Sequence, residues 1–222
     1  MKKLLMIVAM IGMAFTAYAQ EEKENATPAT DAVAKIRLAN ELAKYGYENS
    51  SAIALIQAAE ILAEVETQAL VAESFVAGEG AADAKENAKP EFTAANLIAS
   101  AKELAKGDKH LTALANKVKV QSSNNRGLVG GPGRTVSRVA AYGTDSYVLA
   151  FRGGQVAEIA VSGDGDTDLD LYVYDQNGNL IARDTDYTDN CYVCWVPAWT
   201  GSFVVKIKNR GGVYNQYVLL TN

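Results

Sequence analysis

The last third of the chain alternates apolar and polar residues with a period of two, and this alternation constrains the fold more than any other feature. The apolar side chains of Phe203, Val205 and Ile207 alternate with polar positions that include Lys206 and Lys208. Successive side chains of a strand point to opposite faces of a sheet, so such a segment buries one face and exposes the other. The pattern predicts an antiparallel sheet with one solvated face, on which the two lysines lie.

Further segments around this one are rich in Val, Tyr, Leu and Thr and are separated by Gly, Asn and Asp. Asn177-Gly178 favours a tight hairpin, because both central residues of that turn must tolerate a positive φ. About seven short strands with regular turns are typical of a sandwich. We therefore expect an antiparallel, jelly-roll-like β-sandwich with strands at residues 147–151, 156–162, 169–174, 180–183, 192–196, 202–208 and 214–220.

The preceding part of the chain has a different composition. Residues 30–120 are rich in Ala, Glu, Lys and Leu and poor in Gly and aromatic residues, which favours helices. Their apolar residues recur at helical spacing. The pattern predicts an all-α domain of helical hairpins or a small bundle. The expected helices start at Thr30 or Asp31, near residues 49–51, at Thr93 and at Asp108, and Gly46 is expected to end the first of them.

These segments predict a multidomain α + β chain with a leader and a linker. A positive start at Lys2 and Lys3, a short apolar run and small residues before Gln20 are typical of a signal peptide over residues 1–19. We expect a secreted protein, either extracellular or in the periplasm or cell envelope. No later segment has the roughly 18 consecutive apolar residues of a transmembrane helix. The expected parts are a flexible leader (20–29), a helical domain (30–120), a Gly-rich linker (121–134) and a β-sandwich (135–222).

The net charge of the chain is −5. Nucleic-acid binding depends on Lys and Arg side chains that neutralise phosphates, and this chain is acidic and has no basic cluster. We therefore expect no nucleic-acid partner.

Three segments resemble the bacterial pre-peptidase C-terminal domain family. They are DLDLYVYDQNGN at residues 168–179, TGSFVVKIKN at 200–209 and YNQYVL at 214–219. The resemblance covers about residues 147–222. It implies a compact, non-catalytic β-sandwich appended to secreted proteins, often proteases, which assists export, adds stability or binds extracellular polymers; some relatives bind calcium. In this chain a helical segment precedes the sandwich, so the resemblance implies no protease-accessory role.

An acidic cluster lies just before the strand at residues 169–174. Carboxylates are hard oxygen ligands that suit Ca²⁺, and like charges so close together favour a bound cation. The spacing is not that of an EF-hand, because Leu169 occupies the position that requires glycine. The alternative is a solvated acidic turn that protects a sheet edge. The candidate metal ligands are Asp164, Asp166, Asp168, Asp170 and Asp189, with Asp184 and Asp186 near the last of them.

Several aromatic residues lie close to this cluster. Tyr172 and Tyr174 share one face of a strand, and Tyr187 and Trp195 follow in the next segments. Exposed aromatic rings beside carboxylates suit a platform for a glycan or a peptide, whereas rings in a small sandwich more often serve as core or edge cover. These four residues are the candidate ligand-binding set.

The cysteines and the histidine do not form a catalytic constellation in the sequence. Cys191 and Cys194 are a disulfide candidate, but on a regular strand residues three apart lie about 10 Å apart and need a bulge to pair. His110 is the one histidine and belongs to the helical part. We therefore expect no enzyme.

The sequence thus favours a secreted, non-enzymatic binding or accessory protein whose sandwich binds an extracellular or envelope polymer or protein, with calcium as a structural ligand. Two alternatives remain open at this point. One is a small secreted hydrolase that uses the acidic loop, and the other is a purely structural envelope protein.

Overall fold

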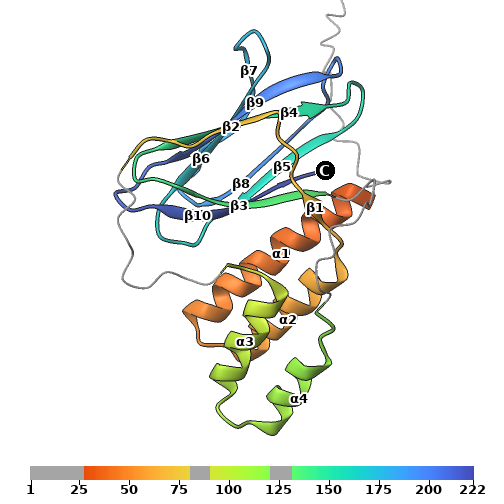
Figure 1. Ribbon diagram of the computed structural model, residues 1–222, viewed down its shortest axis with the longest axis vertical. Helices are drawn as coiled ribbons and strands as arrows, with labels where there is room; N and C mark the ends of the chain where they lie inside the picture. The colour runs from red at the N-terminus through yellow and green to blue at the C-terminus, as the bar shows by residue number, and fades with distance from the viewer. Residues whose placement is uncertain (1–27, 81–90, 121–131) are drawn as a thin grey trace, which may run out of the picture.

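The structure of the chain, a computed structural model, describes residues 28–80, 91–120 and 132–222. A β-sandwich lies at one end and a group of helices packs beneath it (Figure 1). The predicted signal peptide, most of the leader and most of the linker lie outside the described residues. The helices are α1 (Pro28–Glu48), α2 (Ala52–Glu64), α3 (Ala94–Ala105) and α4 (Lys109–Lys117), and the strands are β1 (Gln68–Ala69), β2 (Ser74–Val76), β3 (Gly133–Val139), β4 (Thr144–Phe151), β5 (Ala157–Ser162), β6 (Leu169–Tyr174), β7 (Leu180–Asp184), β8 (Asn190–Trp195), β9 (Gly201–Asn209) and β10 (Asn215–Thr221).

Capping side chains mark the starts of three helices. The side chains of Ser51 and Thr93 each accept a hydrogen bond from the backbone N–H three residues later, at the starts of α2 and α3. Asp108 accepts from the N–H groups of His110 and Leu111 at the start of α4. Such caps satisfy N–H groups that have no partner within the helix. The predicted starts at Thr93 and Asp108 are confirmed.

The prediction that Gly46 ends the first helix is wrong, because α1 continues to Glu48. A Cβ atom at residue 46 would lie 2.4 Å from Leu55 Cδ2. The glycine therefore allows α1 and α2 to approach closely and does not break the helix. The helices share a core that includes Leu55, Leu97 and Ala101.

The sandwich consists of two five-stranded sheets. Sheet A has the order β1-β3-β10-β5-β8, and sheet B has the order β2-β4-β9-β6-β7. From β3 to β10 the chain crosses between the sheets at every connection except the hairpin of β6 and β7, which stays in sheet B, as in a jelly roll. This confirms the predicted helical part followed by an antiparallel sandwich. Phe203, Val205 and Ile207 are buried between the sheets, as their alternation predicts.

A bridging segment, residues 68–80, joins the helices to both sheets and was not predicted. It lies within the range assigned to the helical domain, yet β1 pairs parallel to β3 and β2 pairs antiparallel to β4. Leu70 and Ala72 pack against the sandwich core, and the ring of Phe75 lies 4.5 Å from that of Tyr147. Strand β3 also begins inside the predicted linker, at Gly133.

A buried polar network holds the end of the bridging segment. The Gly78 N–H donates to Asp145 Oδ1 over 2.8 Å, and Tyr217 donates its hydroxyl to Asp145 Oδ2 over 2.6 Å. The hydroxyl oxygens of Tyr217 and Tyr147 lie 2.8 Å apart. Burial of the Asp145 carboxyl raises its pKa, because a low-dielectric site disfavours the charged form. The network connects strands of both sheets to the bridging segment.

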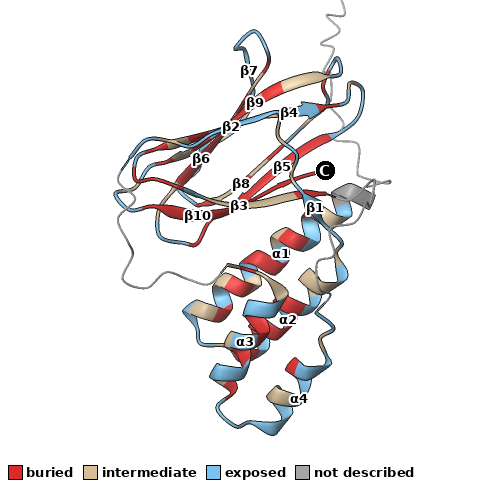
Figure 2. Ribbon diagram, viewed as in Figure 1, coloured by how far each residue is buried: buried red, intermediate tan, exposed pale blue. Residues whose placement is uncertain are grey.

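Helix α1 covers the outer face of sheet A. Its residues Val33 and Ile36 are buried against Ala160, Val218 and Leu220, which point away from the sandwich core. Buried residues run along α1 and along the strands above it (Figure 2). The helical part and the sandwich therefore share an apolar interface.

Charged groups border this interface. The guanidinium carbon of Arg37 lies 4.3 Å from the centroid of the Tyr192 ring, and Lys44 Nζ lies 2.6 Å from Asp189 Oδ1. Arg37 and Lys44 of α1 thus each connect the helical part to the sandwich through a charged side chain. Of the described helices, none has the length and apolar character needed to cross a membrane.

Candidate functional site

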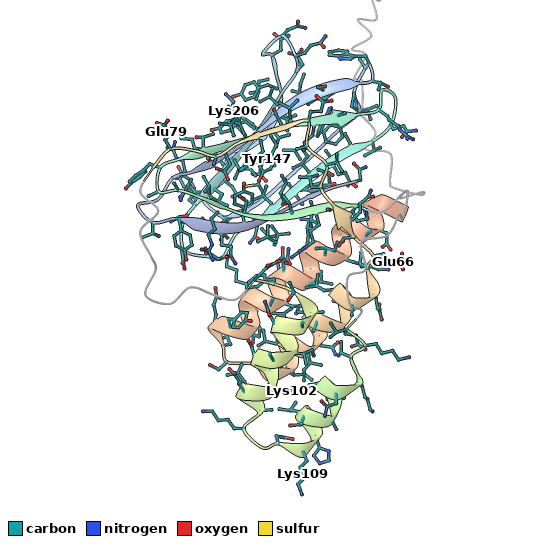
Figure 3. All side chains as sticks on the ribbon, viewed as in Figure 1. Glu66, Glu79, Lys102, Lys109, Tyr147 and Lys206 are labelled. Carbon is teal, nitrogen blue, oxygen red and sulfur yellow. The ribbon has the colours of Figure 1, made fainter. Side chains whose placement is uncertain are left out.

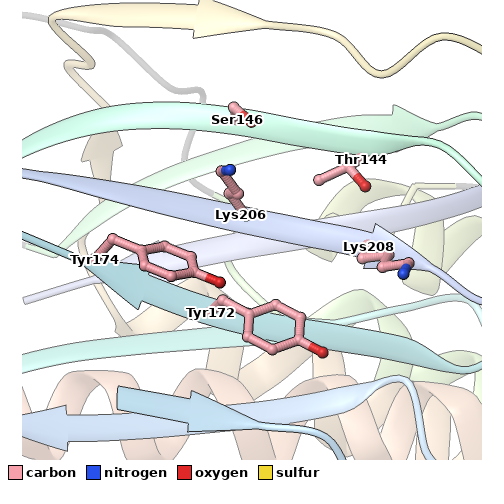
Figure 4. Close-up of a pocket in the computed structure, with 6 residues that line it drawn as sticks. All are labelled: Thr144, Ser146, Tyr172, Tyr174, Lys206 and Lys208. Atoms are coloured by element: carbon pink, nitrogen blue, oxygen red, sulfur yellow. The ribbon is translucent and has the colours of Figure 1, made fainter. Parts of the chain in front are cut away.

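None of the described helices covers the outer face of sheet B (Figure 1), and this face carries aromatic and basic side chains. In the strand register Tyr172 lies opposite Lys206, and Lys206 lies opposite Ser146. Residues directly opposite in neighbouring strands project from the same face, so three strands contribute to one surface. We call this surface the tyrosine–lysine face and define it by Thr144, Ser146, Tyr172, Tyr174, Lys206 and Lys208 (Figure 4).

The tyrosine–lysine face is a shallow hollow of about 490 Å³. The rings of Tyr172 and Tyr174 are stacked, with centroids 6.3 Å apart and planes inclined by 22°. Lys206 Nζ lies 5.3 Å from the centroid of the Tyr174 ring. The face thus offers two aromatic surfaces beside two ammonium groups.

Asp170 holds one of these rings in place. The Tyr172 hydroxyl donates to Asp170 Oδ2 over 3.1 Å, and Arg210 Nε lies 3.7 Å from the same oxygen. Partial burial and this hydrogen bond to a carboxylate raise the pKa of Tyr172, so its hydroxyl stays neutral. The tyrosine pair is therefore an oriented, uncharged surface.

The structure brings together only two of the four aromatic residues predicted to bind a ligand. Tyr187 lies in the connection between β7 and β8 and is 96% exposed. Trp195 belongs to β8 of the other sheet, and its ring packs edge-on against Phe151 and Phe203 at 4.9 and 5.6 Å. Trp195 therefore serves the core, because its strand pairs in sheet A and turns the indole inward.

Sequence reasoning missed the lysines of the tyrosine–lysine face. The alternation around residue 205 assigned Lys206 and Lys208 to the solvent side, and this is confirmed for their strand. What the alternation could not show is the register that places Lys206 opposite Tyr172. Register depends on tertiary pairing between segments about thirty residues apart, and no local pattern encodes it.

Several of the predicted metal ligands form hydrogen bonds or ion pairs with other groups of the protein. Asp164 Oδ2 accepts from the backbone N–H of Gln216 over 3.1 Å. Asp189 is 3% exposed, pairs with Lys44 and accepts from the backbone N–H of Gly165. Both carboxylates thus bind donors of the protein itself.

Asp168 and Asp170, two further predicted metal ligands, differ in their partners. Asp170 faces Tyr172 and Arg210, whereas Asp168 Oδ1 is buried with no hydrogen-bond partner among the described residues. Burial, followed by the nearby charge of Asp170, raises the pKa of Asp168. Within the described ranges, no three His, Cys, Asp or Glu side chains are grouped so that they could hold a metal ion. The described residues as arranged do not fit a calcium site, so calcium binding would require these carboxylates to leave their present partners.

The cysteines and the histidine lie apart from the tyrosine–lysine face. Cys191 and Cys194 are free thiols, one buried and one exposed, because β8 is a regular strand across this spacing. The Cys191 thiol donates to the Leu169 carbonyl over 3.0 Å, and burial raises its pKa, which keeps it protonated. His110 is exposed in the first turn of α4. The disulfide candidate is thus not paired in the structure.

Comparison with known proteins gives similarity in fold only. No protein-family model and no curated protein matches the chain. Solved structures that resemble it include the Yersinia pseudotuberculosis-derived mitogen, with 14% identity, TM-score 0.36 and coverage of 42% of this chain and 86% of the mitogen. PliG from Aeromonas hydrophila, a periplasmic inhibitor of g-type lysozyme, has 15% identity and a TM-score of 0.32, with coverage of 41% of this chain and 84% of PliG. The pre-peptidase C-terminal domain of a Bacillus anthracis collagenase has 14% identity and a TM-score of 0.32, with coverage of 40% of this chain and 89% of that domain. The pre-peptidase family therefore stays a resemblance.

Proposed function

We propose that this protein is an exported, non-enzymatic binding protein whose tyrosine–lysine face binds a polysaccharide of the cell envelope or extracellular matrix. The observation that carries the proposal is the stacked pair of Tyr172 and Tyr174 on an uncovered sheet face. Aromatic rings combine a large apolar surface with a polar edge, which suits the alternating apolar and hydroxyl surfaces of sugar rings. An open, shallow face accepts a chain that extends in both directions.

The arrangement of carboxylates supports binding over hydrolysis. A glycoside hydrolase needs two carboxyl groups on either side of the scissile bond. Asp170 is the carboxylate beside the tyrosine–lysine face, and it is engaged by Arg210 and by the Tyr172 hydroxyl. A purely structural envelope protein, the other alternative, would not require an oriented aromatic pair on an uncovered sheet face.

Affinity electrophoresis against a panel of soluble polysaccharides tests the proposal. The protein is purified from an exported fraction. Mass spectrometry should give the mass of a chain that starts at Gln20, which would show that the signal peptide has been removed. We expect a Tyr172→Ala/Tyr174→Ala variant to lose tenfold or more in affinity, which corresponds to about 1.4 kcal/mol. Thermal melts establish that the variant is folded.

Tyr142→Ala is the matched control, because Tyr142 is 72% exposed and lies in the connection between β3 and β4. It should bind like the wild type. The proposal fails if the wild type binds no polysaccharide, or if the double variant binds as tightly as the control.

A further inference from the structure

We infer that the polysaccharide bound by the tyrosine–lysine face is a carboxylated polyanion, with Lys206 and Lys208 binding its carboxylates. This inference rests on the proposed function and specifies its ligand class. Three observations on the same sheet support it: an excess of basic side chains, two lysines that form no ion pair with any described residue, and the adjacent rows of tyrosines and lysines.

Basic residues exceed acidic ones on this face, although the chain as a whole is acidic. Besides the two lysines, Arg183 lies opposite Tyr172 in the register, and Arg210 lies at the end of β9. Asp170 is the one carboxylate on the described β4, β6 and β9 positions that project from this face, and Arg210 pairs with it. A local positive surface on a chain of net charge −5 concentrates the field where an anionic ligand would bind.

Neither Lys206 nor Lys208 has an ion-pair partner among the described residues. By contrast, Lys35 and Lys44 of α1 both lie within 3 Å of a carboxylate oxygen. Lys206 is exposed, and its ammonium lies beside the Tyr174 ring and not beside an acidic group. The two ammonium groups of β9 are therefore available to carboxylates from outside the molecule.

The two residue types form adjacent rows. Tyr172 and Tyr174 follow β6, and Lys206 and Lys208 follow β9, which is paired with β6. Residues two apart on a strand project from the same face about 7 Å apart, and paired strands lie about 4.8 Å apart. A sugar ring stacked on the tyrosine row thus presents a ring substituent to the lysine row. Lysine ammonium groups are mobile point charges with three donors, which suits carboxylates repeated along a chain.

Single-stranded nucleic acid also combines stacking with negative charge, so it is the competing occupant. Proteins of that kind use a basic groove that follows many phosphates. Here the basic surface is short, and the rest of the chain is acidic. The carboxylated polysaccharide is therefore the better match, and nucleic acid becomes an outcome of the test.

Polygalacturonate and its fully methyl-esterified form test the inference, because they share one backbone and differ in charge. We expect wild-type protein to bind polygalacturonate at least tenfold more tightly than the ester, with a preference that falls as NaCl is raised. A Lys206→Gln/Lys208→Gln variant should bind both polymers alike, at the affinity of the wild type for the ester. Lys102→Gln removes one charge on α3, far from Lys206 (Figure 3), and should keep the preference.

Three other results would overturn the inference. Equal binding of both polymers by wild-type protein, abolished by the tyrosine double variant, overturns the inference and leaves the proposed function standing. Binding of neither polymer, nor of any polysaccharide in the panel, overturns both. Tighter binding of oligothymidylate than of polygalacturonate overturns the inference in favour of nucleic acid.

Discussion

At the scale of single residues, Asp189 lies where the helical part meets the acidic connections of the sandwich. Its side chain is 3% exposed and accepts hydrogen bonds from Lys44 of α1 and from the backbone N–H of Gly165. Its carbonyl accepts from the N–H of Gly163. One carboxylate thus connects a helix to a loop that is close in space and distant in sequence.

We expect Lys44→Ala to lower the free energy of unfolding by about 3 kcal/mol, because it leaves the buried Asp189 carboxylate without its cation. The Lys44 side chain is 22% exposed, which places the loss at the lower end of values for buried pairs. Urea denaturation followed by circular dichroism measures it.

Lys35→Ala is the control for this change. Lys35 pairs with Asp31 on the same helix, but both side chains are more than half exposed, so the loss of stability should be much smaller than for Lys44→Ala. If the two variants lost the same free energy of unfolding, the ion pair of Lys44 and Asp189 would contribute no more to stability than an exposed ion pair.

The acidic residues illustrate what residue patterns can and cannot predict. The closeness of the aspartates predicted a bound cation, whereas in the structure Lys44 pairs with Asp189 and Arg210 pairs with Asp170. The pairing with Lys44 could not be predicted from the local pattern, because Lys44 lies 145 residues before Asp189. Charge balance is a local requirement that a distant part of the fold satisfies.

At the scale of elements, the bridging segment depends on a close approach at Gly78. A Cβ atom there would lie 2.3 Å from the backbone nitrogen of Thr144. The same residue donates its N–H to the buried Asp145 carboxylate. We expect Gly78→Ala to destabilise the protein by about 1–3 kcal/mol, as overpacking does, and to increase amide hydrogen exchange most strongly in β2 and at the start of β4.

Ser74→Ala is the matched change on β2, where the serine is exposed. It should alter stability by less than about 0.5 kcal/mol. If Gly78→Ala exchanges like Ser74→Ala throughout β2, the close approach at residue 78 does not hold the strand.

The elements differ in how far sequence could predict them. Strands β4 to β10 have five or more residues, long enough for alternation to be visible, and all were expected. β1 and β2 have two and three residues, too few to show any period, and β3 begins among glycines that resemble a linker. Their pairing is a tertiary effect, which overrides local preference.

At the scale of the molecule, the predicted order of helical part and sandwich is confirmed, but their packing was not foreseen. Helical periodicity places Val33 and Ile36 on an apolar stripe without saying what covers it. In the structure the outer face of sheet A covers that stripe. The same asymmetry decides where the candidate site lies, since the helices occupy one sheet face and leave the other open.

We expect calcium to leave the melting temperature unchanged within about 1 °C, because Asp164, Asp170 and Asp189 already bind donors of the protein itself. A bound ion at a hundredfold excess over its Kd would add about 2.7 kcal/mol, or roughly 5–10 °C for a chain of this size. Thermal melts in calcium and in chelator, with magnesium as the control, measure the difference. A rise of several degrees with calcium alone would mean that the acidic residues rearrange around the ion.

The packing of α1 on sheet A also bears on how the chain is made. Helix α1 is synthesised before the strands that it packs on, β5 and β10, which come much later in the chain. Val33 and Ile36 therefore have no final partner on the sandwich until both strands have been synthesised. This interface stays unfinished during synthesis, so it forms late although it begins with an early helix.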